Sequence, residues 1–181
     1  YYNDAANLPE SKTLITADAS GMIYYHYLNE NWASQGFGRI DKSKRTAAVG
    51  GELSYTYAYY PDATGRLQTK RSYSDANYTT LVATYTYNND ATNRLQSKVD
   101  STGTYNYYND TTNRLQSKVD LTGTTTYYND AANLRESKTL TTADASGMIY
   151  YHYLNENWAS QGFGRVDKAK RATALNGELS Y

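Results

Sequence analysis

Cysteine is absent from the 181 residues, so neither a disulfide nor a thiolate metal site can hold the chain together. Only two prolines occur and no long glycine- or serine-rich linker interrupts the sequence, so no domain boundary is evident. No apolar run approaches the roughly 20 residues that cross a bilayer, which predicts that there is no membrane span. Lysine and arginine total 18 against 18 aspartates and glutamates, so no net charge attracts nucleic acid, and no nucleic-acid partner is expected.

Histidine, tryptophan, methionine and phenylalanine occur twice each, and both members of every pair lie in a duplicated segment. Residues 1–55 recur as residues 127–181 with 47 of 55 positions identical, at a displacement of 126 residues. A near copy of this length indicates a repeat protein, whose units bury their faces against neighbouring units. We therefore expect residues 1–181 to form a single repeat array, a window of a longer chain with a 126-residue period.

Tyrosine, with 22 copies, is the main packing material, because its large ring and polar tip suit a half-buried sheet surface. Aspartates recur every ten residues from residue 90 to residue 130, each at the start of a turn motif. Asp-x-x-Asn, in which Gly can replace Asn, alternates with Asp-x-[Ser/Thr]-Gly, and the aspartate is expected to accept hydrogen bonds from the following backbone amides. The predicted turn residues are Asp62, Gly65, Asp90, Asn93, Asp100, Gly103, Asp110, Asn113, Asp120, Gly123, Asp130 and Asn133.

Ten residues per turn leave about six for each strand, which is close to the usual strand length. Residues 84–87 and 104–107 alternate with period two, as strands with one face toward a core do. A 20-residue unit is therefore one antiparallel hairpin, and the clearest hairpins lie within residues 84–130. We predict an all-β fold in which tandem hairpins form a continuous, spiralling, solenoid-like β-ribbon. Stacked hairpins would align tyrosines in ladders; the predicted ladder residues are Tyr85, Tyr87, Tyr105, Tyr107 and Tyr127.

Three local features give more specific expectations. Gly65 occupies the turn position that Asn93 and Asn113 occupy elsewhere, so both asparagines should have a left-handed backbone. The Arg-Leu order that follows these turns is reversed in residues 133–135, which predicts a bulge or a changed register there. Residues 29–38 are expected to form a longer loop, and residues 39–45 a basic strand that faces water.

Residues 60–67, with the sequence YPDATGRL, resemble the Tyr-Asp-x-x-Gly-Arg-Leu core of YD repeats. These repeats are found in bacterial Rhs proteins, wall-associated proteins, Tc-toxin C components and animal teneurins. Residues 87–95 and 108–115 are similar, with asparagine in place of glycine. The resemblance implies hairpins joined side by side in a long β-ribbon that spirals into a hollow shell, usually on secreted or surface proteins. Family shells end in a self-cleaving Asp-Pro-rich segment that this chain lacks, and their repeats diverge more than the nearly copied 126-residue unit here.

No constellation in the sequence predicts catalysis or a cofactor. Each turn offers one carboxylate, whereas calcium takes six to eight oxygen ligands, so turn capping is the favoured role of the aspartates. His26 and His152 are one position seen twice, without the further ligands of a metal site or the partners of a triad. Aromatic side chains could form a sugar platform, although filling the inside of a loop is the favoured interpretation. The candidate glycan-contact residues are Trp32, Phe37, Trp158 and Phe163.

The favoured hypothesis is an extracellular or cell-surface structural protein, bacterial in origin, that forms a periodic β-rich filament or stalk. Its expected partner is a further copy or continuation of the same array, and glycans are a second candidate. One alternative is a fragment of an Rhs-type shell that encloses a toxin. Another is a carbohydrate-binding adhesive module, which would need an exposed aromatic groove.

Overall fold

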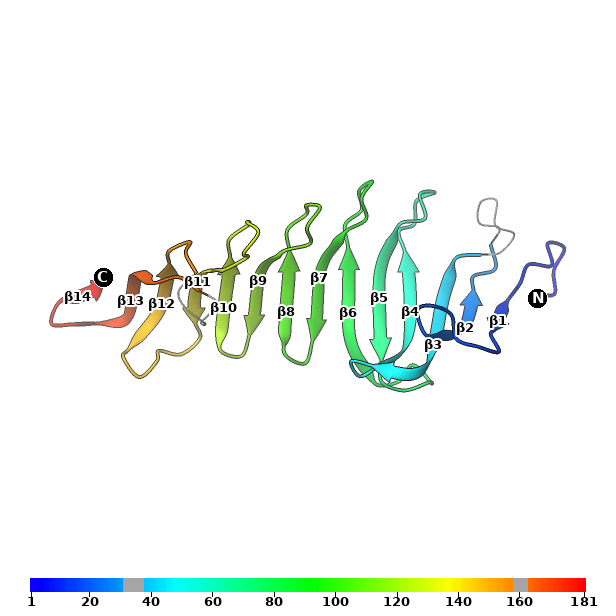
Figure 1. The fold of residues 1–181 in the computed structure, drawn as a ribbon, viewed down its shortest axis with the longest axis horizontal. Coiled ribbons are helices and arrows are strands. Elements are labelled where there is room, and N and C mark those ends of the chain that lie inside the picture. Colours follow the sequence, from blue (N-terminus) through cyan, green and yellow to red (C-terminus); the bar gives the residue numbers. More distant parts are fainter. Residues whose placement is uncertain (31–37, 158–162) are drawn as a thin grey trace. The chain divides into compact units, whose positions relative to one another are not determined.

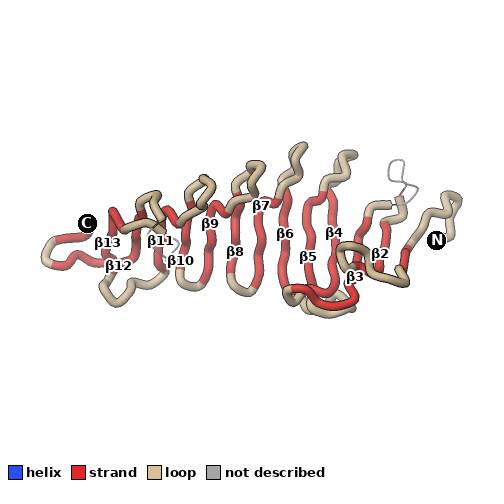
Figure 2. The backbone as a smooth tube through the Cα atoms, viewed as in Figure 1, coloured by secondary structure: helices blue, strands red, loops and turns tan. Residues whose placement is uncertain are grey.

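A computed structural model of the chain describes residues 1–30, 38–157 and 163–181. These residues form fourteen β-strands joined by turns and loops, with no helix among them (Figures 1 and 2). Within this part of the chain there is accordingly no helix of the length and apolarity needed to cross a membrane. The described residues cluster into two compact units, within residues 1–93 and 94–181.

In each unit the order of the strands in the sheet is their order in the chain, and the paired strands are antiparallel. The strands of the first unit are β1 (Ser11–Thr13), β2 (Met22–Tyr27), β3 (Ile40–Val49), β4 (Glu52–Tyr59), β5 (Leu67–Tyr73) and β6 (Leu81–Tyr87). Those of the second unit are β7 (Leu95–Asp100), β8 (Gly103–Tyr107), β9 (Leu115–Asp120), β10 (Gly123–Tyr127), β11 (Arg135–Leu140), β12 (Met148–Tyr153), β13 (Val166–Leu175) and β14 (Glu178–Ser180). The predicted all-β fold of tandem antiparallel hairpins is confirmed.

The second unit contains the most regular hairpins, β7 with β8 and β9 with β10. Short turns of the Asp-x-Thr-Gly type close these hairpins at one edge of the sheet, and the Asp-x-x-Asn loops join successive hairpins at the opposite edge (Figure 1). Successive turns lie at opposite edges of the sheet because an antiparallel chain reverses direction after every strand. Residues of one motif therefore collect along one edge within the unit.

A β-bulge recurs where the last tyrosine of an even-numbered strand meets the start of the next strand. In the second unit the register shifts after Asn106, so that Tyr107 faces Leu115, and it shifts again between Thr126 and Tyr127. The first unit has the same shift at Tyr59. The bulge on β11 lies at residue 136, next to residues 133–135 where the reversed order predicts one. An equivalent bulge occurs beside the ordinary Arg-Leu order, so the reversal is not its cause.

The most buried row of the first unit consists of one tyrosine and three small side chains. Ser43, Tyr55, Ser72 and Ala83 are successive cross-strand partners in β3 to β6, and Tyr55 is only 1% exposed. Serine and alanine leave room for the tyrosine ring above the sheet. The expectation that residues 39–45 face water is wrong, because Ser43 is fully buried in this row. β3 is a central strand paired on both sides, and its exposed residues are Lys42 and the far end, residues 46–49.

The duplicated segments have the same local structure. The pairing of β2 with β3 and that of β12 with β13 have the same register and the same two irregularities, displaced by 126 residues. The bulge between His26 and Tyr27 recurs between His152 and Tyr153. Equal sequence has therefore produced equal strand pairing in two separate units.

Candidate functional site

The first recurring site is the Asp-x-x-Asn turn. Asp90 Oδ1 accepts hydrogen bonds from the backbone amides of Thr92 at 2.8 Å and Asn93 at 3.1 Å. The sequence predicts a left-handed backbone at Asn93 and Asn113, and their φ angles are 46° and 55°. Asn133 has a φ of 47° and the same aspartate contact, from Asp130. The carboxylate thus compensates for backbone amides that no strand can satisfy inside the turn.

The asparagine side chain of these turns also links one hairpin to the preceding one. Asn93 Nδ2 donates to the Leu67 carbonyl at 2.8 Å, and its Oδ1 accepts the Leu67 amide at 2.9 Å. In the second unit Asn133 makes the same pair of bonds to Leu115, at 2.8 and 3.0 Å. An amide side chain can imitate a neighbouring strand in this way because it carries one donor and one acceptor side by side. We call this contact the asparagine bridge.

Sequence reasoning treated glycine and asparagine as equivalent here and missed the asparagine bridge. Gly65 can adopt the same backbone, with a φ of 69°, but has no side chain with which to pair. Asparagine recurs at a position where glycine would satisfy the backbone, and this recurrence indicates that the asparagine side chain has a role of its own. Recognising the partner still required knowing which strand lies beside the turn.

A tyrosine provides a second link between hairpins. The hydroxyl of Tyr60 donates to the carbonyl of Tyr87 at 2.6 Å. In the second unit the hydroxyl of Tyr108 reaches the Tyr127 carbonyl at 2.8 Å, and that of Tyr128 reaches the Tyr153 carbonyl at 2.6 Å. Each donor precedes a turn aspartate by two residues, and each acceptor ends the next even-numbered strand. We call this contact the tyrosine staple; its donors were not among the predicted ladder residues.

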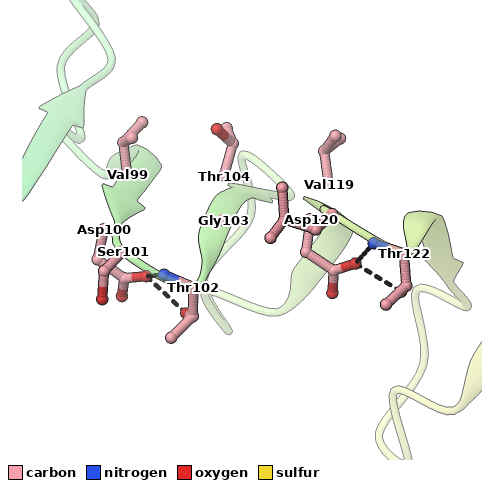
Figure 3. Close-up of a pocket in the computed structure, with 10 residues that line it drawn as sticks. Val99, Asp100, Ser101, Thr102, Gly103, Thr104, Val119, Asp120 and Thr122 are labelled. Carbon is pink, nitrogen blue, oxygen red and sulfur yellow. Dashed lines mark hydrogen bonds between the residues drawn. The ribbon is translucent and has the colours of Figure 1, made fainter. Parts of the chain in front are cut away.

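The turns at the other edge use threonine as well as aspartate. Asp100 accepts bonds from the amide and hydroxyl of Thr102 at 2.8 and 2.6 Å, and Asp120 repeats both with Thr122 (Figure 3). A Cβ on Gly103 would lie 2.3 Å from the Val119 carbonyl oxygen, so only glycine fits between the strands. These two turns border a shallow hollow of about 390 Å³, which Val99 also lines.

Lysines neutralise these turn aspartates. Lys98 Nζ lies 2.7 Å from Asp100 Oδ2, and Lys118 Nζ lies 3.1 Å from Asp120 Oδ2. Burial by itself would raise the pKa of Asp100, but bonds from Lys98 and Thr102 outweigh it and lower the pKa to about 2. Bonds from Thr122 and then Lys118 lower the pKa of Asp120 in the same way. Both turns therefore carry ionised aspartates at neutral pH.

Lysines also lie beside two of the predicted ladder tyrosines, Tyr85 and Tyr105. In the second unit Tyr105 faces Lys98 on one side and Lys118 on the other, with the ammonium groups 5.7 and 5.3 Å from the ring centre. In the first unit Lys70 Nζ lies 4.3 Å from the Tyr55 ring centre and 5.0 Å from that of Tyr85. Strand pairing thus places a lysine on each side of the Tyr105 ring, and the contacts in both units are of the kind favoured by cation–π attraction.

The remaining ladder residues, Tyr87, Tyr107 and Tyr127, each end an even-numbered strand. Tyr107 faces Leu115 and Tyr127 faces Arg135 across the strands. Tyr87 ends β6 in the first unit, and burial raises its pKa. These three tyrosines are half-buried rather than exposed to solvent.

The duplicated histidine pairs with an aspartate in both copies. Nδ1 of His26 lies 2.5 Å from Asp41 Oδ1, and Nδ1 of His152 lies 2.5 Å from Asp167 Oδ1. The hydrogen bond from His152 lowers the pKa of Asp167. A tyrosine ring lies edge-on to each imidazole, with centres 6.4 to 6.5 Å apart. Across residues 1–30, 38–157 and 163–181, no three His, Asp or Glu side chains gather as they would to hold a metal ion.

The candidate glycan-contact residues are placed only in part. Trp32, Phe37 and Trp158 lie outside the described residues. The ring of Phe163 packs against Tyr153, with centres 5.0 Å apart, and beneath the Arg135 guanidinium at 4.6 Å. Phe163 therefore packs against residues of β12 and β11.

The recurring sites share one chemistry, in which side chains substitute for backbone partners and so join one hairpin to the next. Neither the family models nor the curated proteins contain a match to this chain.

Proposed function

We propose that this chain is a structural repeat protein without catalytic activity, located outside the cell or on its surface, whose hairpins form a periodic filament or stalk. The observation that carries the proposal is the repetition of the tyrosine staple and the asparagine bridge between successive hairpins. Both contacts are made to backbone groups, so they require only another hairpin of the same geometry. An array held by nearest-neighbour contacts can be lengthened one unit at a time.

The expected partner is more of the same array. Strand edges expose amide and carbonyl groups that can pair with a further strand, whether it belongs to the same chain or to another copy. The near-equal strand pairing of the two duplicated segments supports addition of whole 126-residue units. The resemblance of residues 60–67 to YD repeats supports a bacterial surface location.

Concatemers test the proposal. Proteins with one, two and three 126-residue periods would be compared by small-angle scattering and electron microscopy. A filament or stalk predicts that the longest dimension increases by a constant step with each period. A control joined at 116-residue spacing lacks one strand at each junction and should aggregate or lose β-structure. Concatemers that form compact closed particles would instead favour a shell.

A further inference from the structure

A polar hollow of about 400 Å³ lies on the sheet of the second unit, between two successive hairpins. Its walls come from β8, the loop after it, β9, β10 and β11. Its lining includes Asn106, Tyr108, Gln116, Ser117, Thr126 and Glu136. The volume suits one or two sugar-sized rings, at the lower end of typical ligand sites. The hollow shares no lining residue with the turn hollow near Val99.

The floor of this polar hollow is a row of small polar side chains whose positions are fixed by cross-strand pairing. Asn106 faces Ser117, which in turn faces Thr126. Asn106 Nδ2 donates to Ser117 Oγ at 3.0 Å, and the hydroxyls of Thr126 and Ser137 lie 2.7 Å apart. Because these bonds already orient the groups, a ligand would lose little affinity to ordering them.

Two longer side chains reach the hollow from bulge positions. Tyr107 pairs with Leu115, and the preceding residue Asn106 pairs with Ser117, so Gln116 has no partner across the strands and is the extra residue of the bulge. Glu136 is the extra residue of the next bulge, because Tyr127 pairs with Arg135 and Thr126 with Ser137. A bulge turns its side chain away from the regular alternation of the strand. An amide and a carboxylate from equivalent repeat positions are thereby brought to one place, with Thr126 Oγ1 3.4 Å from Glu136 Oε2.

Tyr108 supplies an aromatic wall. Its hydroxyl is held by the tyrosine staple to the Tyr127 carbonyl at 2.8 Å, so the ring cannot swing away from the hollow. Burial raises the pKa of Tyr108, and the nearby carboxylates of Glu136 and then Asp110 raise it further. Tyr108 and Glu136 both line the hollow, so one ligand can contact the ring and the carboxylate together.

We infer that this polar hollow binds a neutral saccharide. A pyranose presents a patch of C–H groups that packs on an aromatic ring, and hydroxyls that both donate and accept hydrogen bonds. The lining matches both features, with one ring, two amides, hydroxyls and a carboxylate. Among the described residues that line it, Glu136 is the only charged side chain, and its negative charge disfavours phosphate, sulfate and acidic sugars. Such a site goes beyond the structural role and would let the array hold a glycan surface.

The test uses the intact chain, with chitotriose, cellotriose and 3′-sialyllactose as probes in saturation-transfer NMR and calorimetry. The variants are Gln116→Ala and Glu136→Gln. Gln96→Ala is the matched control for the first, because Gln96 has the same repeat position one hairpin earlier and does not line the hollow. Glu10→Gln is the control for the second, because Glu10 is the counterpart of Glu136 in the first copy. Circular dichroism checks that every variant keeps the wild-type fold.

At least one neutral trisaccharide should bind saturably, and Gln116→Ala should weaken that binding by about tenfold or more, as expected for a lost ligand hydrogen bond. Both control variants should bind like the wild type. Sialyllactose should bind more weakly than the neutral probes, and Glu136→Gln should reduce that difference. The inference is overturned if no neutral probe binds saturably, if the controls weaken binding as much as the hollow variants, or if sialyllactose is preferred. The concatemer experiment is independent of each of these results.

Discussion

At the scale of single residues, the asparagine of the Asp-x-x-Asn turn has two separate tasks. It adopts a left-handed backbone, which glycine does at no steric cost. Its amide also pairs with the backbone of the preceding hairpin, at Leu67 for Asn93 and at Leu115 for Asn133. Substitutions can separate the two tasks, because glycine removes only the second.

Asn93→Gly should therefore lower the free energy of unfolding by about 1 kcal/mol through loss of the asparagine bridge. Asn93→Val should cost more, by about another 1 kcal/mol, because a β-branched residue is strained at a φ of 46°. Urea denaturation measures both values. Ala91→Gly, in the same turn, is the control for general loosening. Equal stability of the Asn93→Gly variant and the wild type would show that the bridge contributes nothing.

The turn aspartates predict acid sensitivity. The folded pKa of Asp100 is about 2, below its ordinary value of 3.8, so its contribution to stability is complete above about pH 4. That contribution should be lost as the pH falls toward 2, because protonation breaks the bonds from Lys98 and Thr102. The free energy of unfolding measured from pH 7 to pH 2 should decrease in this range. The decrease should be smaller in Asp100→Asn, and an unchanged pH profile in that variant would contradict the assignment.

At the scale of elements, the hairpins combine a regular pleat with a recurrent bulge. The bulge places Tyr107 opposite Leu115 and frees Gln116 from the alternation. Between hairpins, tyrosine staples add a contact that the backbone ladder alone does not make. Each staple joins the loop that precedes one odd-numbered strand to the end of the next even-numbered strand.

Removing a staple hydroxyl should destabilise each unit by a similar amount. Tyr60→Phe and Tyr128→Phe each delete one 2.6 Å bond to a backbone carbonyl, and each should cost about 1 kcal/mol. Thermal and urea unfolding provide the measurement. Tyr1→Phe should be neutral, because the Tyr1 side chain is 77% exposed. Staple variants as stable as Tyr1→Phe would mean that the hydroxyl bonds only replace equivalent bonds to water.

At the scale of the whole molecule, the chain is built from interchangeable units. The clearest evidence is that the pairing of β2 with β3 recurs, irregularities included, in β12 and β13. Strands pair with their neighbours in sequence, and the bridges and staples reach only to the adjacent hairpin, so removing a unit need not disturb distant ones. This property distinguishes a repeat array from a domain with one central core.

Deletion of residues 104–123 tests this modularity. The deletion removes one 20-residue period and joins Gly103 to Thr124, so β7 should pair with β10 through the existing Asp100 turn. Circular dichroism should show retained β-structure with a cooperative but less stable transition. Deletion of residues 104–113 is the matched control, because it removes one strand and reverses the alternation of every later turn. If both deletions unfold the protein equally, the hairpins are not independent units.

The sequence alone determined the hairpins, their 20-residue period and the conformation of the turns, because these depend on side-chain alternation and on local backbone sterics. The sequence identifies turn residues such as Asp90, Asn93 and Gly65 without any knowledge of their neighbours in space. Only the tertiary structure decided which strand each turn touches, and hence the asparagine bridge and the tyrosine staple. It also decided that Ser43 is buried, because burial depends on pairing with strands on both sides rather than on the polarity of a segment. The polar hollow likewise depends on two bulges 20 residues apart meeting across the sheet, a juxtaposition set by register.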